Sequence, residues 1–259
     1  MNIAISGMGG FIGSYLSLTL GSAGNTVIRI PRELLHSSEG LPEFFNKIKP
    51  DEIYHLAGYG NMINQTDIPM TVVANYMGTW SMLRASQNIP YTKFVFVSSS
   101  STFLAYETFY SASKGGAERL AKAFRNTYKK PVYIMRPYSV YGPGESDSRF
   151  IPTVCKCLIR GNTLNLDPEP HHDWVYIDDL VNTMITIHED ADIGSGRSLT
   201  NADIVAKLEK ISFKKAKIRY TKNTRPFDTE NWKSDECWTK TPIEEGLRIT
   251  YEYYQRRFT

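Results

Sequence analysis

The sequence opens with MNIAISGMGGFIG (residues 1–13), and this stretch decides the fold. A short apolar run, Asn2–Ser6, passes directly into a cluster of glycines, and Phe11–Leu20 continues with helical spacing of apolar residues. The cluster follows the pattern G-x-x-G-x-x-G, at Gly7, Gly10 and Gly13. Glycine lets the backbone turn tightly, and the positive end of a helix attracts an anion such as a pyrophosphate. The stretch therefore predicts a strand, turn and helix that bind a dinucleotide, with an ordinary glycine-rich turn as the alternative.

Strands and helices alternate along the first half of the chain. The later predicted strands cover Asn25–Ile30, Asp51–Ala57, Lys93–Ser98 and Pro131–Arg136. The predicted helices cover Phe11–Leu20, Leu41–Ile48, Thr71–Gln87 and Ser111–Tyr128. Such alternation is typical of parallel strands that are joined by right-handed crossovers, with helices on both faces of the sheet. The sequence therefore predicts an α/β fold with a doubly wound parallel sheet of the Rossmann type, whose ligand lies beyond the carboxyl ends of the strands.

The alternation ends after Arg136, where Pro137–Asp147 is rich in proline and glycine and predicts a loop. Beyond it we expect a helix over Phe150–Arg160, a proline-broken stretch over Leu164–His172, a strand and helix over Asp173–Glu189, and an amphipathic helix over Ile243–Arg256. These elements predict a small C-terminal substrate domain. The predicted division gives residues 1–138 and 173–195 to the Rossmann domain, and residues 139–172 and 196–259 to the substrate domain.

Composition excludes several classes of protein. The 259 residues are 41% hydrophobic and 22% charged, which suits a packed globular protein, and the net charge of +3 is too small to indicate nucleic acid or a membrane as a partner. The apolar runs fall short of the ~20 residues that span a bilayer, and Met1–Ile5 already reads as a core strand, so we expect a cytoplasmic protein. The cysteines indicate neither a disulfide framework nor a metal site; they are Cys155, Cys157 and Cys237.

The residues after the second predicted strand bear on the choice of cofactor. An acidic side chain there would bind the ribose hydroxyls of NAD. This chain has Arg29-Ile30-Pro31-Arg32 instead, and Glu33 is the nearest carboxylate. Arg32, or less favourably Arg29, could pair with the 2′-phosphate of NADP, although either could be a solvated surface arginine. The residues favour NADP over NAD by a small margin.

A Tyr-x-x-x-Lys pair, Tyr110 and Lys114, begins the predicted helix that follows the serine run Ser98–Ser101. Residues four apart share one face of a helix, about 6 Å apart along its axis. The ammonium group would favour the phenolate and lower a tyrosine pKa that starts near ~10. Tyr110 could then act as an acid and base, and a serine hydroxyl could bind the same substrate oxygen. The alternative is a surface tyrosine and lysine behind a helix-capping serine.

Several further motifs occur in a fixed order. They are His55-Leu56-Ala57-Gly58, Asn75-Tyr76-Met77-Gly78-Thr79, FVFVSSSS, YSASKGGAERL, Arg136-Pro137-Tyr138-Ser139-Val140-Tyr141-Gly142-Pro143-Gly144 and DWVYIDD. With the glycine cluster, they make the chain resemble the extended short-chain dehydrogenase/reductase family, in its branch of NAD(P)-dependent nucleotide-sugar epimerases, dehydratases and reductases. The resemblance covers about residues 1–195 well and the remaining residues more loosely.

The resemblance implies a role for each matching residue. Ser100 corresponds to the catalytic hydroxyl, with Ser99 as the alternative, Tyr110 to the acid and base, and Lys114 to the lysine that also holds the nicotinamide ribose. The implied cofactor contacts are Gly7, Gly10, Phe11, Ile12, Gly13, Arg32, Leu56, Ala57, Gly58, Asn75, Ser98, Tyr110, Lys114, Pro137 and Val140. The implied substrate contacts are Ser100, Ser139 and His172.

The chain also departs from the family pattern. Dehydratases of this branch have an Asp-Glu pair after the catalytic hydroxyl, where this chain has Ser101-Thr102, so 4,6-dehydration is not expected. Ser139 replaces an asparagine that often binds substrate. His172 replaces an arginine that often binds the diphosphate, although His171 and His172 could still donate to phosphate. We expect C4 epimerisation or 4-keto reduction of a nucleotide sugar by a Ser-Tyr-Lys triad. The alternatives are a non-catalytic NAD(P)-binding sensor and a reductase of a non-sugar carbonyl compound.

Relatives often dimerise through the helix that carries Tyr-x-x-x-Lys and a neighbouring long helix. Here these would be Ser111–Tyr128 and Thr71–Gln87. Their apolar positions include Val73, Met77, Leu120 and Phe124. Because these residues could equally belong to the core, the sequence leaves a homodimer open. The expected partner is otherwise a nucleotide-sugar substrate alone, with no nucleic acid and no membrane.

Overall fold

The computed structural model describes residues 1–36, 39–62, 64–222 and 232–259. The chain folds as two compact units. The first comprises Met1–Arg136 and Met184–Ala191, and the second comprises Pro137–Thr183 and Asp192–Thr259. The domain division predicted from the sequence places its boundaries at residues 138, 173 and 195, and it stays a prediction. Within the described ranges, no helix is both long and apolar enough to cross a membrane.

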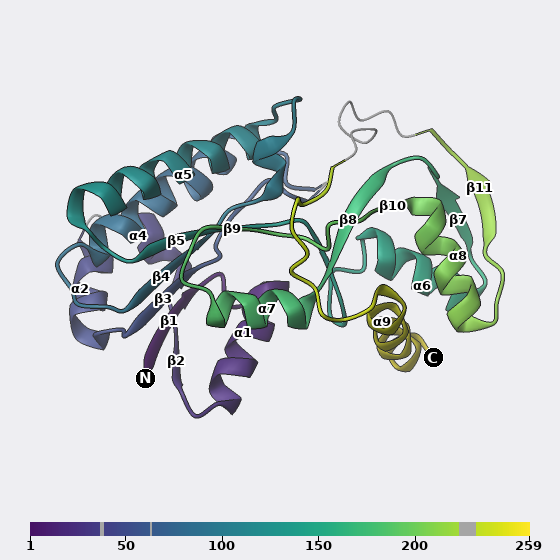
Figure 1. The fold of residues 1–259 in the computed structure, drawn as a ribbon, viewed down its shortest axis with the longest axis horizontal. Coiled ribbons are helices and arrows are strands. Elements are labelled where there is room, and N and C mark those ends of the chain that lie inside the picture. The colour runs from purple at the N-terminus through teal and green to yellow at the C-terminus, as the bar shows by residue number, and fades with distance from the viewer. Residues whose placement is uncertain (37–38, 63, 223–231) are drawn as a thin grey trace. The chain divides into compact units, whose positions relative to one another are not determined.

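A parallel sheet forms the centre of the first unit (Figure 1). Its strands are β1 (Asn2–Ser6), β2 (Thr26–Arg29), β3 (Glu52–His55), β4 (Lys93–Val97), β5 (Val132–Pro137) and β9 (Ala191–Ile193). They follow the order β2-β1-β3-β4-β5-β9, and the first five pair in parallel. The winding reverses between β1 and β3, and such a switch point is where open α/β sheets bind ligands. The predicted Rossmann-type doubly wound sheet is confirmed.

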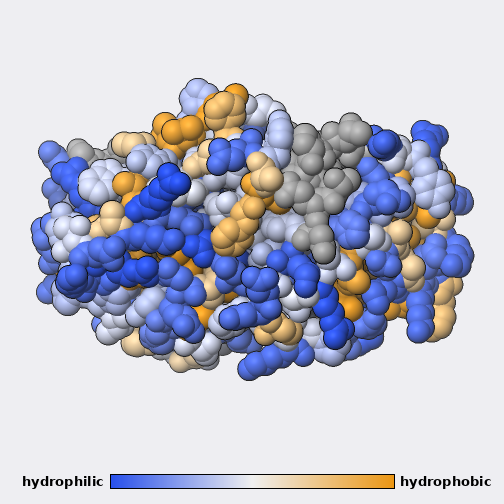
Figure 2. Space-filling view, turned by 45° about the horizontal axis from the view of Figure 1, so that its top comes forward, coloured by the Kyte–Doolittle hydropathy of each residue, from blue (hydrophilic) through white to orange (hydrophobic). Residues whose placement is uncertain are grey.

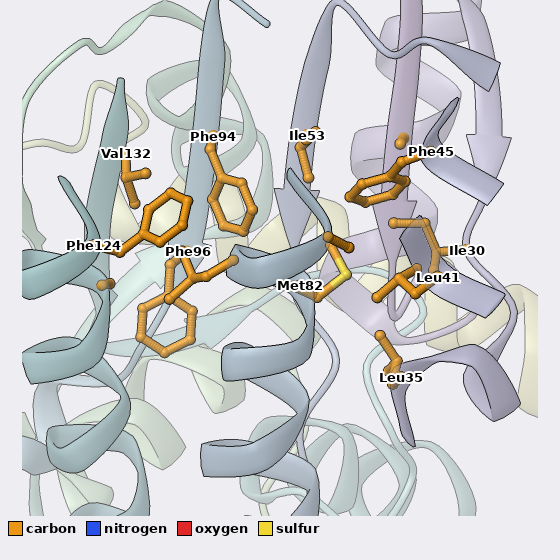
Figure 3. Packing of buried hydrophobic residues seen from close by; sticks show 14 of the residues in the cluster. Ile30, Leu35, Leu41, Phe45, Ile53, Met82, Phe94, Phe96, Phe124 and Val132 are labelled. Atoms are coloured by element: carbon orange, nitrogen blue, oxygen red, sulfur yellow. The ribbon is translucent and has the colours of Figure 1, made fainter. Parts of the chain in front are cut away.

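Helices cover both faces of this sheet (Figure 1). They are α2 (Gly40–Ile48), α4 (Gly78–Ser86) and α5 (Phe109–Tyr128) on one face, and α1 (Phe11–Ser22) on the other. Phe94 and Phe96 of β4 point to the same face because side chains alternate along a strand. They pack in one buried cluster with Met82 of α4 and Phe124 of α5 (Figure 3). Each such burial contributes about 1.5–3 kcal/mol, so this face anchors α5 to the sheet.

The predicted regular helix Thr71–Gln87 is interrupted in the structure. It consists of α3 (Ile68–Val72), the π-helical turn η2 (Val73–Met77) and α4. Buried Asn75 lies in the centre of η2. Single π turns inside α-helices occur frequently at functional sites because the extra residue redirects a side chain. The regular helical pattern of the sequence did not reveal this turn.

Among its described residues, the second unit contains two small sheets and three helices that pack together. Its elements are β6 (Ser139–Tyr141), α6 (Phe150–Arg160), β7 (Thr163–Leu166), β8 (His171–Tyr176), the start of α7 (Ile177–Thr186), β10 (Ser198–Thr200), α8 (Asn201–Ser212), β11 (Lys217–Tyr220) and α9 (Ile243–Phe258). β8 lies between β10, which is antiparallel to it, and β6, which is parallel. β7 pairs in parallel with β11, and α6, α8 and α9 pack against one another.

One expectation about this unit was wrong, and one helix was not predicted. We predicted a loop over Pro137–Asp147, but β6 forms there because Val140 pairs with Val175 of β8. We made no prediction over residues 201–212, where α8 forms. Its signal was present in the sequence, since Thr200 and Asp203 make a capping box just before an apolar helical pattern. The predicted helices Phe150–Arg160 and Ile243–Arg256 are confirmed, and the second extends to Phe258.

Candidate active site

The glycines after β1 occupy positions where a side chain would collide with backbone. Gly7 has a φ of +71°, in the left-handed region that favours glycine, and a Cβ there would lie 2.7 Å from the backbone nitrogen of Ala57. A Cβ on Gly13 would overlap the carbonyl oxygen of Gly7 and lie 2.8 Å from Cα of Met8. Gly10 begins α1 without a side-chain cap, which leaves the helix N-terminus available to an anion. The loop therefore suits the close approach of a pyrophosphate.

His55, at the end of β3, is fully buried and connects two neighbouring elements. Its Nδ1 lies 2.6 Å from Ser6 Oγ, and its Nε2 lies 3.1 Å from Thr79 Oγ1. Thr79 donates its own hydroxyl proton to a backbone carbonyl, so it accepts from Nε2–H, and Ser6 donates to Nδ1. Burial, and then the charge of Lys114, lower the pKa of His55 to about 3, so the imidazole is neutral at physiological pH. This network fixes the strand end that leads to Ala57, whose N–H donates to Ser6 Oγ.

Asn75 of η2 uses its whole side-chain amide to hold the segment after β3. Its Oδ1 accepts from Tyr59 N at 2.9 Å, and its Nδ2 donates to Tyr59 O and Ser113 Oγ, each at 2.9 Å. The backbone approaches closely at Gly58, where a Cβ would lie 3.1 Å from Asn75 Oδ1 and 3.3 Å from Lys114 Nζ. Three predicted cofactor contacts, Gly58, Asn75 and Lys114, therefore meet beyond the end of β3.

The first turn of α5 carries Tyr110. A capping box fixes this turn, since Thr108 Oγ1 accepts from Ser111 N while Ser111 Oγ accepts from Thr108 N. Tyr110 is half-buried and lies one helical turn before Lys114, so both side chains share one face of the helix. The structure therefore keeps the helical spacing on which the acid–base prediction depends.

Lys114 is almost completely buried at the carboxyl end of β4. Its Nζ donates to Val97 O at 2.9 Å and lies 5.2 Å from the centre of the Phe96 ring. Burial lowers the pKa of Lys114 to about 8, while the attraction of Glu118 opposes this shift. The ammonium form is therefore dominant at neutral pH and is lost as the pH rises through about 8.

The serines that follow β4 differ in the contacts that they make. Ser98 Oγ donates to Glu118 Oε1 at 2.6 Å. Ser99 Oγ caps the short helix η3 (Ser100–Phe103) and accepts from both the N–H and the hydroxyl of Ser101. Ser100 is buried within η3, which packs against α5. The capping role of Ser99 argues against it as the catalytic hydroxyl and favours Ser100.

The arginines after β2 lie in different surroundings. The guanidinium of Arg29 lies beside the glycine loop, with Nη2 3.6 Å from the place of a Cβ on Gly9. Arg32 begins the short helix η1 (Arg32–His36) and is exposed. Across the described part of the chain, neither arginine forms an ion pair. Arg29, which we expected less than Arg32, is therefore well placed to meet an anion at the loop.

The second unit brings Ser139 and His172 together. Pairing of β6 with β8 places Ser139 Oγ 3.3 Å from His172 Nδ1. Two tryptophan rings pack near the imidazole, with ring centres 5.2 Å away for Trp174 and 6.4 Å away for Trp232. His171 is the neighbouring residue of β8 and is in register with β10. A hydroxyl and an imidazole are therefore adjacent and able to donate to anionic oxygens.

Asp173, next to His172, is fully buried and joins distant segments of the second unit. Its Oδ1 accepts from the N–H and the hydroxyl of Ser195, each at 2.6 Å. Its Oδ2 accepts from Gly196 N at 3.1 Å and Ser234 N at 3.0 Å. Four donors to one carboxylate make a strong charge-assisted connection. Asp173 therefore fixes the strand that carries His172.

A model of the NAD dependent epimerase/dehydratase family matches residues 3–201, which is most of the chain. The chain belongs to this family. The motifs predicted a resemblance to nucleotide-sugar epimerases and dehydratases, and this prediction is confirmed.

Individual members of the family show how far the similarity extends. The dTDP-D-glucose 4,6-dehydratase of Dictyostelium discoideum is 27% identical over 81% of this chain and 62% of its own length, so the chain spans under two thirds of that relative. The UDP-glucose 4-epimerase of Thermotoga maritima, solved with UDP-glucose, has a TM-score of 0.86 at 21% identity and full coverage of both chains. The UDP-glucuronic acid 4-epimerase of Bacillus cereus, solved with UDP-glucuronic acid and NAD, has a TM-score of 0.85 at 23% identity and covers 99% of this chain and 100% of its own. These structures share the fold of the family.

Most of the predicted site residues of this family member come together within their own units. In the first unit, Leu56 and Ala57 lie against Gly7, while Phe11 and Ile12 begin α1. Pro137, Ser139, Val140 and His172 belong to the second unit. The sequence analysis missed three buried polar residues that organise the site, namely His55, Glu118 and Asp173. Each lies inside a motif quoted above, but only the folded chain reveals its partners.

Proposed function

We propose that this chain is an NAD(P)-dependent enzyme that epimerises a nucleotide sugar at C4. The observation that carries the proposal is the buried Lys114 ammonium, held by Val97 O one helical turn from Tyr110 and next to Gly58. The glycine positions fit a dinucleotide, because Gly7 and Gly13 leave no room for a Cβ. The two structures reported above are 4-epimerases of UDP-sugars, which supports the reaction and the substrate class.

The proposed chemistry divides among three side chains. Tyr110, as the phenolate, takes the proton from the sugar hydroxyl and later returns it. Ser100 donates a hydrogen bond to the same oxygen, and the Lys114 ammonium stabilises the phenolate. Bound NAD(P) would supply the hydride acceptor and donor for the sugar carbon. Ser139 and His172 of the second unit are the proposed donors to the diphosphate of the substrate.

Dehydration is a less suitable reaction for this site, although the relative from Dictyostelium is a dehydratase. The residues that follow Ser100 are Ser101 and Thr102, where dehydratases of the branch have two carboxylates. Both hydroxyls are engaged locally, since Ser101 Oγ donates to Ser99 Oγ and Thr102 Oγ1 donates to Ser99 O. The η3 segment therefore holds no acid that could assist the loss of water.

Product analysis tests the proposed reaction. Purified protein is incubated with NAD and with UDP-glucose or UDP-glucuronic acid, and the sugars are separated and identified by NMR. We expect the C4 epimer, with the total of oxidised cofactor unchanged after many turnovers. A 4-keto-6-deoxy product would contradict the proposal.

Reduction of a 4-keto sugar with consumption of NADPH is the second candidate, and the position of Arg29 beside the glycine loop favours it.

The proposed preference for NADP predicts unequal effects of the two arginines on cofactor affinity. Arg29→Ala should weaken NADPH binding about 10–100-fold, because a charge-assisted hydrogen bond contributes about 1.5–3 kcal/mol, and should leave NADH binding nearly unchanged. Arg32→Ala should have a smaller effect, since Arg32 is exposed on η1. Fluorescence titration with both nucleotides measures the affinities. Equal losses for NADH and NADPH would show that Arg29 does not recognise the 2′-phosphate.

We also propose a homodimer through the helical face of α3, η2 and α4. Exposed apolar side chains line this face, with exposed fractions of 39% for Val73, 46% for Met77 and 38% for Trp80. Figure 2 shows apolar side chains gathered in places on an otherwise hydrophilic surface. Phe124 and Leu120, the other two apolar residues named from the sequence, pack in or against the core instead.

Light scattering after gel filtration tests the proposed dimer. Met77→Glu should convert a dimer to a monomer, because it places a charge in the centre of the apolar face. Leu18→Glu on α1 is the matched control, since Leu18 is 68% exposed on a different helix and should leave the dimer intact. A monomeric wild-type protein would refute the dimer.

A further inference from the structure

A buried ion pair lies one turn beyond Lys114 on α5. Glu118 and Arg136 are each 7% exposed, and Arg136 Nε donates to Glu118 Oε1 at 2.9 Å. The ring of Phe103 lies over the guanidinium, 5.3 Å from its centre. A buried pair of this kind is costly to desolvate and contributes little net stability by itself. Its position beside the proposed catalytic residues points to a role in the site rather than in stability.

One oxygen of Glu118 connects four elements of the first unit. Besides Arg136 near the end of β5, Oε1 accepts from Ser98 Oγ at 2.6 Å, and Thr102 Oγ1 shares its proton between Ser99 O at 2.9 Å and Oε1 at 3.4 Å. Ser98 directly follows β4, and Thr102 lies in η3. Ser100 lies between these two anchors in the chain. Glu118 on α5 therefore holds both sides of the segment that carries the proposed catalytic hydroxyl.

Glu118 also influences the charge of Lys114. Burial disfavours the ammonium form of Lys114, and Glu118 is the carboxylate that opposes this effect. Tyr110 shares the helix face of Lys114, and His55 on β3 interacts with its charge. His55 is neutral because of its low pKa. Glu118 is therefore the group that favours the cation.

We propose that Glu118 is a positioning residue, which holds the Ser98–Thr102 segment against α5 and places a carboxylate one helical turn from Lys114. The consequence for turnover rests on the proposed function, whereas the effect on Lys114 does not. Arg136 acts with Glu118 by orienting its carboxylate. The Glu118–Arg136 pair thereby acts on the position of the Ser100 hydroxyl. It also acts on the charge of Lys114, which favours the phenolate of Tyr110.

An NMR titration of lysine labelled with 13C at Cε tests the effect on Lys114 without any turnover. The Lys114 signal is assigned by its loss in Lys114→Arg. In Glu118→Gln, the pKa of Lys114 should fall from about 8 by about 1 unit, because an attractive charge is lost. Thr102→Val removes the hydrogen bonds of a neutral hydroxyl to Glu118 Oε1 and to Ser99 O but no charge, so it is the matched control and should leave the titration unchanged.

If Glu118 had only a structural role, the pKa of Lys114 would change in the opposite direction in Glu118→Gln. Loosening of the site would admit water and raise the pKa of Lys114 towards its ordinary value, so a rise or no change in Glu118→Gln overturns the proposal. If that variant does not fold, Glu118→Asp carries the test, because it keeps the negative charge but moves it away from Lys114. The pKa of Lys114 should again fall, and a rise or an unchanged value overturns the proposal. In an active enzyme, the alkaline limb of kcat/KM should move to lower pH in Glu118→Gln. An inactive wild type would contradict the proposed function and leave the NMR result valid.

Discussion

Gly13→Ala should remove tight binding of the dinucleotide. The new Cβ would overlap the carbonyl oxygen of Gly7 and approach Cα of Met8, and both are backbone atoms that cannot rotate away. The glycine loop and the start of α1 must therefore move apart, which withdraws the helix N-terminus from the pyrophosphate. We expect about a 100-fold loss of cofactor affinity, or roughly 2.7 kcal/mol, and a loss of stability of about 1–3 kcal/mol from overpacking. Isothermal titration with NAD and NADPH measures the affinity, and chemical unfolding measures the stability.

Gly21→Ala is the matched control on the same helix. A Cβ at Gly21 has no atom within 4 Å, and alanine is favoured over glycine in a helix by about 0.5–1 kcal/mol. This variant should therefore be slightly more stable and bind the cofactor normally. Unchanged affinity in Gly13→Ala would mean that the glycine loop does not contact the dinucleotide, and the proposed cofactor site would have to be abandoned.

The sequence was sufficient for the first unit because its signals are local. Each buried strand is a short apolar run, so Asn2–Ser6 was predicted with the bounds that the structure shows, and the predicted helix Leu41–Ile48 differs from α2 by one residue. The short strands of the second unit lack such signals. β6 has three residues and depends on pairing with β8, more than thirty residues later. Likewise, η2 interrupts a regular pattern where Asn75 binds Tyr59 and Ser113, which no local spacing can reveal.

In the candidate site, too, the sequence identified residues but not the partners that they contact. Tyr110 and Lys114 were predicted because four residues of helix relate them, and the helical spacing is present. Ser100 and Ser99 could not be separated as the catalytic hydroxyl in a run of four serines, because the argument against Ser99 depends on its capping of η3 in the folded chain. The preference for Arg32 over Arg29 has the same origin, since only the folded loop places Gly9 beside Arg29.

Tyr110→Phe should reduce kcat by about 10²–10⁴-fold, the contribution that a positioned acid and base makes to such reactions. Phenylalanine keeps the ring and the capping box of Thr108 and Ser111, so the fold and the buried Lys114 should persist. Affinity for the cofactor should fall little, because the glycine loop and Lys114 remain. Stopped assays of sugar product measure kcat, and titration with the nucleotide measures the affinity of the same preparation.

Tyr128→Phe separates the loss of this hydroxyl from a general effect on α5. Tyr128 ends the same helix, is 43% exposed, and packs its ring on Phe124, so removal of its hydroxyl should leave kcat unchanged. A fall in kcat confined to Tyr110→Phe, with the cofactor still bound, supports acid–base catalysis by Tyr110. Full activity in Tyr110→Phe would refute the proposed triad. A wild type that binds the cofactor and converts no sugar would instead favour the alternative of a non-catalytic sensor.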